Sequence, residues 1–136
     1  MKKLTCIIKI NSEIDKIWFH WNDNYSIEKW NIPFSDWKCQ EIENNLKVGG
    51  KFDYRMGNIG ETDGFNYKGQ YTNIIVNELI ETLGDDNRPS QILFKTEGKQ
   101  VTIIETFEPE SKTPIDIQEE FINTILTKFK NFVENK

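Results

Sequence analysis

The sequence predicts an α+β domain in which a curved antiparallel sheet wraps around a long C-terminal helix. The first observation is a helical stripe of apolar residues over 115–133, and the second is a run of six strand-like segments joined by short turns. The third is that the 136 residues contain no linker composition and no internal repeat, so residues 1–136 form one domain. The predicted order is one strand, two short helices, six strands and the long helix (β-α-α-β-β-β-β-β-β-α).

The predicted final helix shows the clearest pattern. Its apolar residues recur at steps of three and four, with polar residues between them. They are Ile117, Phe121, Ile122, Ile125, Leu126, Phe129, Phe132 and Val133. Thr113 suits the N-cap position and Pro114 the first helical position. A helix of about 28 Å with such a stripe must cover a wide apolar surface, and the strands supply one as a sheet.

The N-terminal part is predicted as a strand followed by two helices. Apolar and polar residues alternate over 4–10, as in a half-buried strand. Ser12 and Asp15 resemble a capping box before a helix that carries two tryptophans on its apolar side. A second helix is predicted from about residue 26 to Trp30, and Pro33 ends it.

The middle of the chain is predicted as six strands. They cover about 36–46, 52–56, 65–71, 79–83, 92–94 and 101–107. Gly49-Gly50 marks one turn and residues 97–100 mark a tight hairpin, while 57–64 form a polar loop. Because short turns join consecutive strands, we expect an antiparallel meander with all helices on one face.

Composition excludes several functional classes. The net charge of −5, without a basic run, argues against nucleic-acid binding. No segment approaches the ~20 apolar residues of a membrane span, and we expect a cytoplasmic protein. Cys6 and Cys39 lack zinc-site spacing, so no metal site is predicted; packed thiols are favoured, with a disulfide left open. No motif indicates a cofactor or a catalytic centre.

Several short motifs resemble those of a known family. An apolar helix with an Ile17-Trp18 pair is followed by Trp30, then by the turn and strand Val48-Gly49-Gly50-Lys51-Phe52. Gly69-Gln70-Tyr71-Thr72-Asn73-Ile74 and Val101-Thr102-Ile103 complete the pattern. With the element order, these motifs resemble the helix-grip fold of the START-like (SRPBCC, Bet v allergen-like) superfamily. The similar branch is the one named for the activator of the heat-shock-protein-ninety ATPase. Its final helix often opens with Gly-Trp, where this chain has Phe121-Ile122.

The resemblance implies a cavity between the sheet and the final helix, occupied by a small apolar or amphipathic ligand such as a lipid. The predicted ligand-binding residues face this space. They are Trp18, Phe52, Tyr54, Met56, Phe65, Tyr67, Tyr71, Phe94, Ile103, Glu105, Phe121, Ile125 and Phe129. The alternative is a filled core, since the same large side chains either line a space or fill it.

Glu105 is the most informative of these residues. Its strand parity places it on the inward side with Ile103 and Phe107, where a carboxyl would be desolvated and its pKa raised. Paired with Tyr54 or Tyr67, it could orient a polar ligand group or act as a general acid or base. The alternative is a β-bulge that turns Glu105 to solvent.

Three functions remain open at this stage. The favoured one is ligand binding without catalysis. The second is a cyclase-like or hydrolase-like enzyme that uses Glu105, with His20 either packed or a proton donor at the cavity mouth. The third, which the resemblance suggests, is a chaperone-accessory module in the stress response, with an exposed patch of Trp30, Phe34 and Trp37.

Overall fold

The computed structural model describes residues 3–62 and 64–136 and has the predicted element order. Residue 63, in the loop predicted for 57–64, lies outside the described residues, as do residues 1 and 2. The elements are β1 (Leu4–Ile10), α1 (Ile14–Asn22), α2 (Asn24–Trp30), β2 (Trp37–Asn44), β3 (Lys51–Asn58), β4 (Phe65–Ile75), β5 (Leu79–Gly84), β6 (Pro89–Glu97), β7 (Gln100–Phe107) and α3 (Ile115–Glu134).

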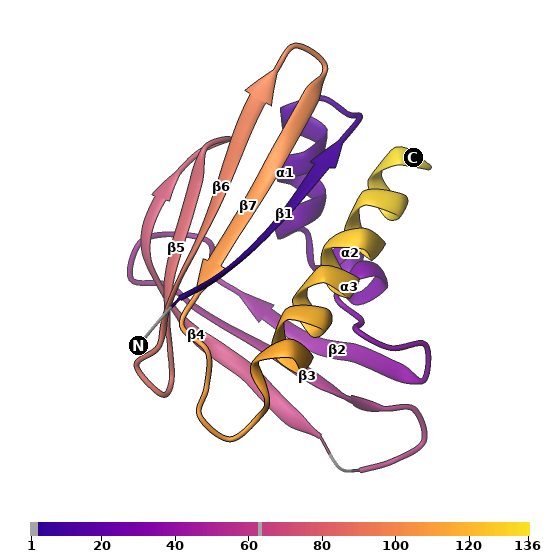
Figure 1. Ribbon diagram of the computed structural model, residues 1–136, viewed down its shortest axis with the longest axis vertical. Helices are drawn as coiled ribbons and strands as arrows, with labels where there is room; N and C mark the ends of the chain where they lie inside the picture. Colours follow the sequence, from indigo (N-terminus) through magenta and orange to yellow (C-terminus); the bar gives the residue numbers. More distant parts are fainter. Residues whose placement is uncertain (1–2, 63) are drawn as a thin grey trace.

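The strands form one antiparallel sheet in the order β1-β7-β6-β5-β4-β3-β2. Strands β2 to β7 are the predicted meander, and β1 joins it by pairing with the last strand. Figure 1 shows the sheet curling around α3, with α1 and α2 near the C-terminal half of this helix. The fold is therefore the predicted α+β helix-grip arrangement.

The two glycine motifs of the sequence meet in the sheet. The Gly49 amide donates to the Tyr71 carbonyl (2.8 Å), and the Tyr71 amide donates to the Gly50 carbonyl (2.9 Å). Gly49 has a φ of +85°, which favours glycine. A Cβ on Gly69 would lie 2.6 Å from the Leu83 carbonyl oxygen and 2.9 Å from the Phe52 ring. The glycines thus allow the β2–β3 turn and the close approach of β3, β4 and β5.

Two irregularities bend the sheet. The β2–β3 register shifts between Gln40 and Glu43, where Glu41 has a φ of 51°. The β4–β5 register shifts between Tyr71 and Asn73. Extra residues of this kind kink one strand and increase its twist, which helps a sheet to curve around a helix.

The helix starts differ from the predicted capping. The Ser12–Asp15 capping box was wrong, because Glu13 occupies the N-cap of α1 and makes no side-chain cap bond within the described chain. The N-cap of α3 is Pro114 rather than Thr113, and the Pro114 carbonyl accepts from Gln118 N at 3.2 Å. Pro114, whose ring fixes its φ angle, therefore lies immediately before the first turn of α3. Helix α2 begins two residues early because the Asp23 carboxylate accepts from its first turn.

The core is tightly packed around the C-terminal half of α3. Trp21 and Trp30 lie with ring centroids 4.7 Å apart, and Phe129 lies 4.9 Å and 4.7 Å from them. Phe129 and Val133 are completely buried. This cluster joins α1, α2, α3 and the sheet into one body.

The two cysteines lie on opposite edge strands, Cys6 on β1 and Cys39 on β2. They are separate buried thiols rather than a disulfide, and burial raises the pKa of each to about 11. Across residues 3–62 and 64–136, no helix has the length and apolarity needed to cross a bilayer.

Candidate functional site

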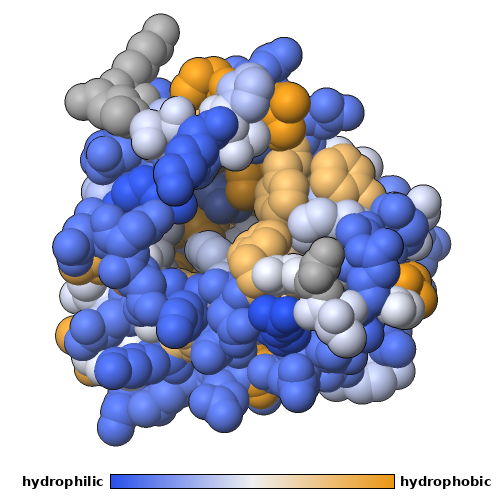
Figure 2. All heavy atoms as spheres, turned by 90° about the horizontal axis from the view of Figure 1, so that it is seen from below, coloured by the Kyte–Doolittle hydropathy of each residue, from blue (hydrophilic) through white to orange (hydrophobic). Residues whose placement is uncertain are grey.

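The other half of the space between the sheet and α3 is hollow. A cavity of about 480 Å³ lies between β3–β7 and the N-terminal half of α3. Figure 2 shows the molecule from below, with this hollow opening among hydrophobic side chains on one side and hydrophilic ones on the other. The sequence left a filled core and a cavity as alternatives, and the structure contains both, one at each end of α3.

Aromatic rings of β3 and β4 form the floor of the cavity. The ring centroid of Phe52 lies 5.2 Å from those of both Tyr67 and Tyr71, and the Tyr54 and Tyr67 centroids are 5.9 Å apart. Phe52, Tyr71 and Met56 are buried side chains that line the cavity. The alternation of β3 and β4 places these side chains on one face of the sheet, as predicted.

Two of the three tyrosine hydroxyls are held by the wall. The Tyr54 and Tyr71 hydroxyls hydrogen-bond one another, and Tyr71 donates to Asn44 Oδ1. Asn44 Nδ2 in turn donates to the Asn22 carbonyl at 3.0 Å. Burial raises the pKa of Tyr54 well above its ordinary value, so this hydroxyl stays protonated.

A second group of rings surrounds the opening. Between ring centroids, Phe121 of α3 lies 6.1 Å from Trp37 and 6.2 Å from Phe34. The Trp37 and Phe65 centroids are 6.0 Å apart. Phe34 and Phe65 are 40% and 42% exposed, so the opening has an apolar edge. A carbon-rich ligand can therefore remain in contact with rings as it enters.

Glu105 lies in the wall of the cavity on β7. Its strand pairs without a register shift on both sides, so no bulge turns the carboxyl to solvent, and of the two alternatives left by the sequence the inward one holds. Burial raises the pKa of Glu105 from its ordinary value of 4.5 to about 7. Within the described chain, its carboxyl makes no hydrogen bond. It is therefore free to meet a ligand.

Tyr67 is the third tyrosine, and its hydroxyl has no hydrogen-bond partner among the described residues. Tyr67 is 43% exposed, and it lines the cavity. Burial, followed by the nearby Glu105 carboxyl, raises the pKa of Tyr67. Glu105 and Tyr67 thus form a pair of polar groups in a largely aromatic space.

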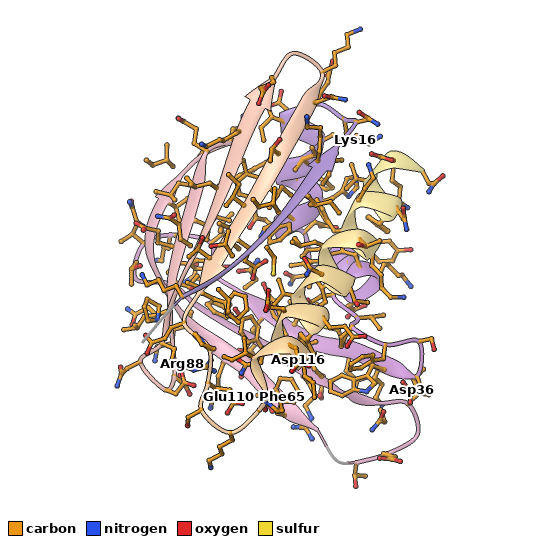
Figure 3. The ribbon with its side chains drawn as sticks, in the orientation of Figure 1. Lys16, Asp36, Phe65, Arg88, Glu110 and Asp116 are labelled. Atoms are coloured by element: carbon orange, nitrogen blue, oxygen red, sulfur yellow. The ribbon has the colours of Figure 1, made fainter. Side chains whose placement is uncertain are left out.

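Charged groups gather at the lower end of the cavity. Arg88 Nε donates to Asp86 Oδ2 at 2.5 Å, and Arg88 Nη1 donates to the Glu108 carbonyl at 3.1 Å. Figure 3 shows Arg88 and Glu110 at this end, near Phe65. The Thr113 hydroxyl and the Lys112 amide lower the pKa of Glu110, so this carboxylate stays ionised.

The structure brings nine of the thirteen predicted site residues to the cavity. These are Phe52, Tyr54, Met56, Phe65, Tyr67, Tyr71, Glu105, Phe121 and Ile125. Four others, Trp18, Phe94, Ile103 and Phe129, do not line it. They face inward, but they belong to the packed half, where Trp18 and Phe94 lie 5.3 Å apart. The periodicity of a strand or helix predicts whether a side chain faces inward. It does not predict whether that side chain lies at the hollow end or the packed end of α3.

Two further expectations concern His20 and Trp30. His20 is packed, the first of its two alternatives: its Nδ1 lies 2.8 Å from Ser26 Oγ, its ring contacts Phe132, and it does not line the cavity. Trp30 is buried, so the predicted exposed patch does not exist as one surface. All three rings, Trp30, Phe34 and Trp37, border the cavity.

Sequence reasoning missed the polar rim. Arg88, Asp86, Glu108 and Glu110 lie in or beside loops, where no periodicity marks the direction of a side chain. Gln118 is also on the cavity side of α3, and its Nε2 donates to the Thr113 carbonyl at 2.8 Å. The one available signal was the density of charge around the two loops that flank β6 and α3.

The fold and the cavity define a helix-grip protein of the START-like (SRPBCC) superfamily. The family described as "Activator of Hsp90 ATPase homolog 1-like protein" matches residues 11–134. This chain belongs to that family.

Solved structures agree with this assignment. An AHSA1-like protein from Aeromonas hydrophila is 30% identical, with a TM-score of 0.91 over 98% of this chain and 93% of its own. A protein from Cytophaga hutchinsonii is 32% identical, with a TM-score of 0.85 over 98% and 92%. A Chromobacterium violaceum protein at 16% identity and a TM-score of 0.83, over 98% and 99%, shares the fold. No curated protein matches the sequence.

Proposed function

We propose that this protein binds a small amphipathic ligand in the cavity beneath the N-terminal half of α3. The observation that supports this most directly is a space of about 480 Å³ whose wall holds Glu105, a carboxyl that hydrogen-bonds to none of the described residues. Pockets of roughly 300–1,000 Å³ with mostly apolar walls and a few polar groups are typical of small-molecule sites. The carbon body of the ligand contacts the rings, and its polar end meets Glu105 and Tyr67.

Apolar burial supplies the affinity. A ligand that loses about 200 Å² of carbon surface gains about 5 kcal/mol before the costs of immobilisation. The floor rings are held in place by packing and by the Tyr54–Tyr71–Asn44 hydrogen bonds, so little of this gain is spent on ordering the site.

The test is thermal unfolding with a panel of fatty acids, long-chain amines, sterols and aromatic polyketides. A true ligand at a hundredfold excess over its dissociation constant stabilises the folded protein by about 2.7 kcal/mol. Ile92→Trp places a large ring in the cavity and should abolish the shift. Leu93→Trp is the matched control, because Leu93 is the neighbouring residue on the other face of β6 and does not line the cavity.

A panel that moves neither the wild type nor Leu93→Trp would contradict the proposal. So would a ligand shift of equal size in Ile92→Trp, because binding would then occur elsewhere on the surface.

A second function, proton-transfer catalysis, is favoured by one observation. A carboxyl with a pKa of about 7 inside a cavity is suited to act as a general acid or base near neutral pH. The discriminating experiment incubates a ligand found in the screen with wild type and with Glu105→Gln. Conversion by the wild type alone supports an enzyme; equal binding without conversion in either supports a binding protein.

A further inference from the structure

The charges that line the cavity are unequal in sign. The acidic residues are Asp86, Glu105, Glu108 and Glu110, whereas Arg88 is the one basic residue among the described residues of the lining. This imbalance is stronger than that of the whole chain, which has 17 basic and 22 acidic residues. Such a cavity attracts cations and repels anions.

Arg88 already makes hydrogen bonds to its neighbours. Its Nε and backbone amide donate to the Asp86 carboxylate, and Nη1 donates to the Glu108 carbonyl. Although partial burial acts in the opposite direction, the hydrogen bonds from Arg88 lower the pKa of Asp86. Arg88 therefore neutralises a neighbouring aspartate and is poorly placed to receive an anionic ligand as well.

Glu105 is placed differently from the rim carboxylates. It lies within the wall, opposite Ile92 on β6 and Cys6 on β1, and no described residue supplies it with a cation. The Tyr67 ring is nearby, and Tyr54 and Phe52 continue the aromatic surface from there. A carboxylate beside aromatic rings suits a positively charged group, which pairs with the carboxylate and contacts ring faces.

We infer that the ligand of this cavity carries a protonated amine, which pairs with the Glu105 carboxylate while its carbon body contacts the aromatic walls. This inference rests on the proposed binding function and narrows its ligand class to cationic amphiphiles. Fatty acids and other carboxylates are disfavoured by the same charge balance.

The pairing predicts a proton linkage. Cys6 and Tyr67 interact with Glu105 directly, and Asp86, Arg88 and Glu119 each interact with one of those two. The pKa values of Cys6 and Tyr67 are raised and that of Asp86 is lowered, so none of these three changes charge around neutrality. Glu105 does change charge there, because burial raises its pKa to about 7. An alkylamine, with a pKa of about 10.4 like that of lysine, stays protonated.

The experiment compares three probes with the same chain, decylamine, decan-1-ol and decanoate, below their aggregation limits. Calorimetry or the fluorescence of the cavity tryptophans measures binding to wild type, Glu105→Gln and the control Glu97→Gln. Glu97 is an exposed residue at the end of β6, so it loses the same charge far from the cavity.

At about pH 8 the wild type should bind the amine about tenfold more tightly than the alcohol, and decanoate least tightly. The amine affinity should fall about tenfold at about pH 6, where Glu105 is mostly protonated, while the alcohol affinity should not fall. Glu105→Gln should reduce the amine affinity to that of the alcohol, and Glu97→Gln should behave like the wild type.

Other results overturn the inference. If the alcohol or decanoate binds as tightly as the amine, or if the amine preference survives in Glu105→Gln, the cationic ligand class is wrong while ligand binding stands. An amine preference that is independent of pH would also overturn it, because Glu105 would not be its cause. If none of the probes binds at either pH, the proposed function fails together with this inference.

Discussion

The two halves of the space between the sheet and α3 are built from the same kinds of side chain, yet one half is filled and the other is hollow. Along one stripe of α3, exposure falls from 47% at Ile117 to 6% at Ile125 and to zero at Phe129. Phe129 lies against Trp21 and Trp30, whereas Phe121 lies at the cavity with Trp37 and Phe34.

The difference comes from the short helices. Helices α1 and α2 contact α3, and they insert Trp21 and Trp30 between it and the sheet. Trp21 and Trp30 also border the cavity, and beyond them, beneath the N-terminal half of α3, the side chains of the sheet, the loops and α3 do not fill the space. The packed half therefore holds the helix on the sheet, and the other half can stay open for a ligand.

A matched pair of substitutions on α3 should show the largest difference between the packed and the hollow half. Phe129→Ala removes a fully buried ring and should lower the free energy of unfolding by about 3–5 kcal/mol. Phe121→Ala, two turns earlier, removes a ring that is only partly buried and should cost about 1–2 kcal/mol. Urea unfolding measures both. Equal losses would mean that the two halves are packed alike.

The second test uses Glu105 and pH. Because folding raises the pKa of this carboxyl from 4.5 to about 7, its neutral form stabilises the protein fully below pH 4.5, and this is lost as the pH rises through 7. Relative to Glu105→Gln, the wild type should lose up to about 3 kcal/mol of unfolding free energy over that range. If the free energy of unfolding changed with pH equally in the two proteins, the Glu105 carboxyl would be exposed to water rather than buried.

The third test adds volume to each half. Ile103→Phe overpacks a fully buried site on β7 and should cost about 1–3 kcal/mol. Ile92→Phe, on the adjacent strand β6, directs the same extra atoms into the cavity and should cost under about 1 kcal/mol. Unfolding free energies measure the difference. A larger cost at Ile92 than at Ile103 would contradict the hollow.

The smallest expected effect concerns the tyrosines of the floor. Tyr71→Phe removes the hydroxyl that donates to Asn44 and should lower the free energy of unfolding by about 1 kcal/mol. Tyr67→Phe removes a hydroxyl without a partner among the described residues, so it should change stability by less than about 0.5 kcal/mol. If Tyr67→Phe is the more destabilising, this hydroxyl belongs to the wall rather than to the ligand site.

The fold was predictable because its signals are local. Alternation in β3 and β4 and the three-four spacing in α3 each specify an element and its inward face, and short turns specify antiparallel neighbours. The predicted strand 92–94 was too short: in β6, Pro89 and the polar residues 95–97 also pair with the adjacent strands. Ladder hydrogen bonds involve the backbone, and side-chain pattern does not report them.

The amino-acid pattern alone was enough to predict the element order and the inward faces of β3, β4 and α3, whereas for Glu105 it left an inward position and a β-bulge as alternatives. Periodicity encodes these properties because strands and helices repeat at fixed intervals. Three-dimensional packing was needed to establish that Trp18, Phe94, Ile103 and Phe129 are packed and that the space below Ile125 is open. It was also needed to place Arg88, Asp86, Glu108 and Glu110 around that space. These properties depend on where elements distant in sequence meet, and no local repeat encodes that distance.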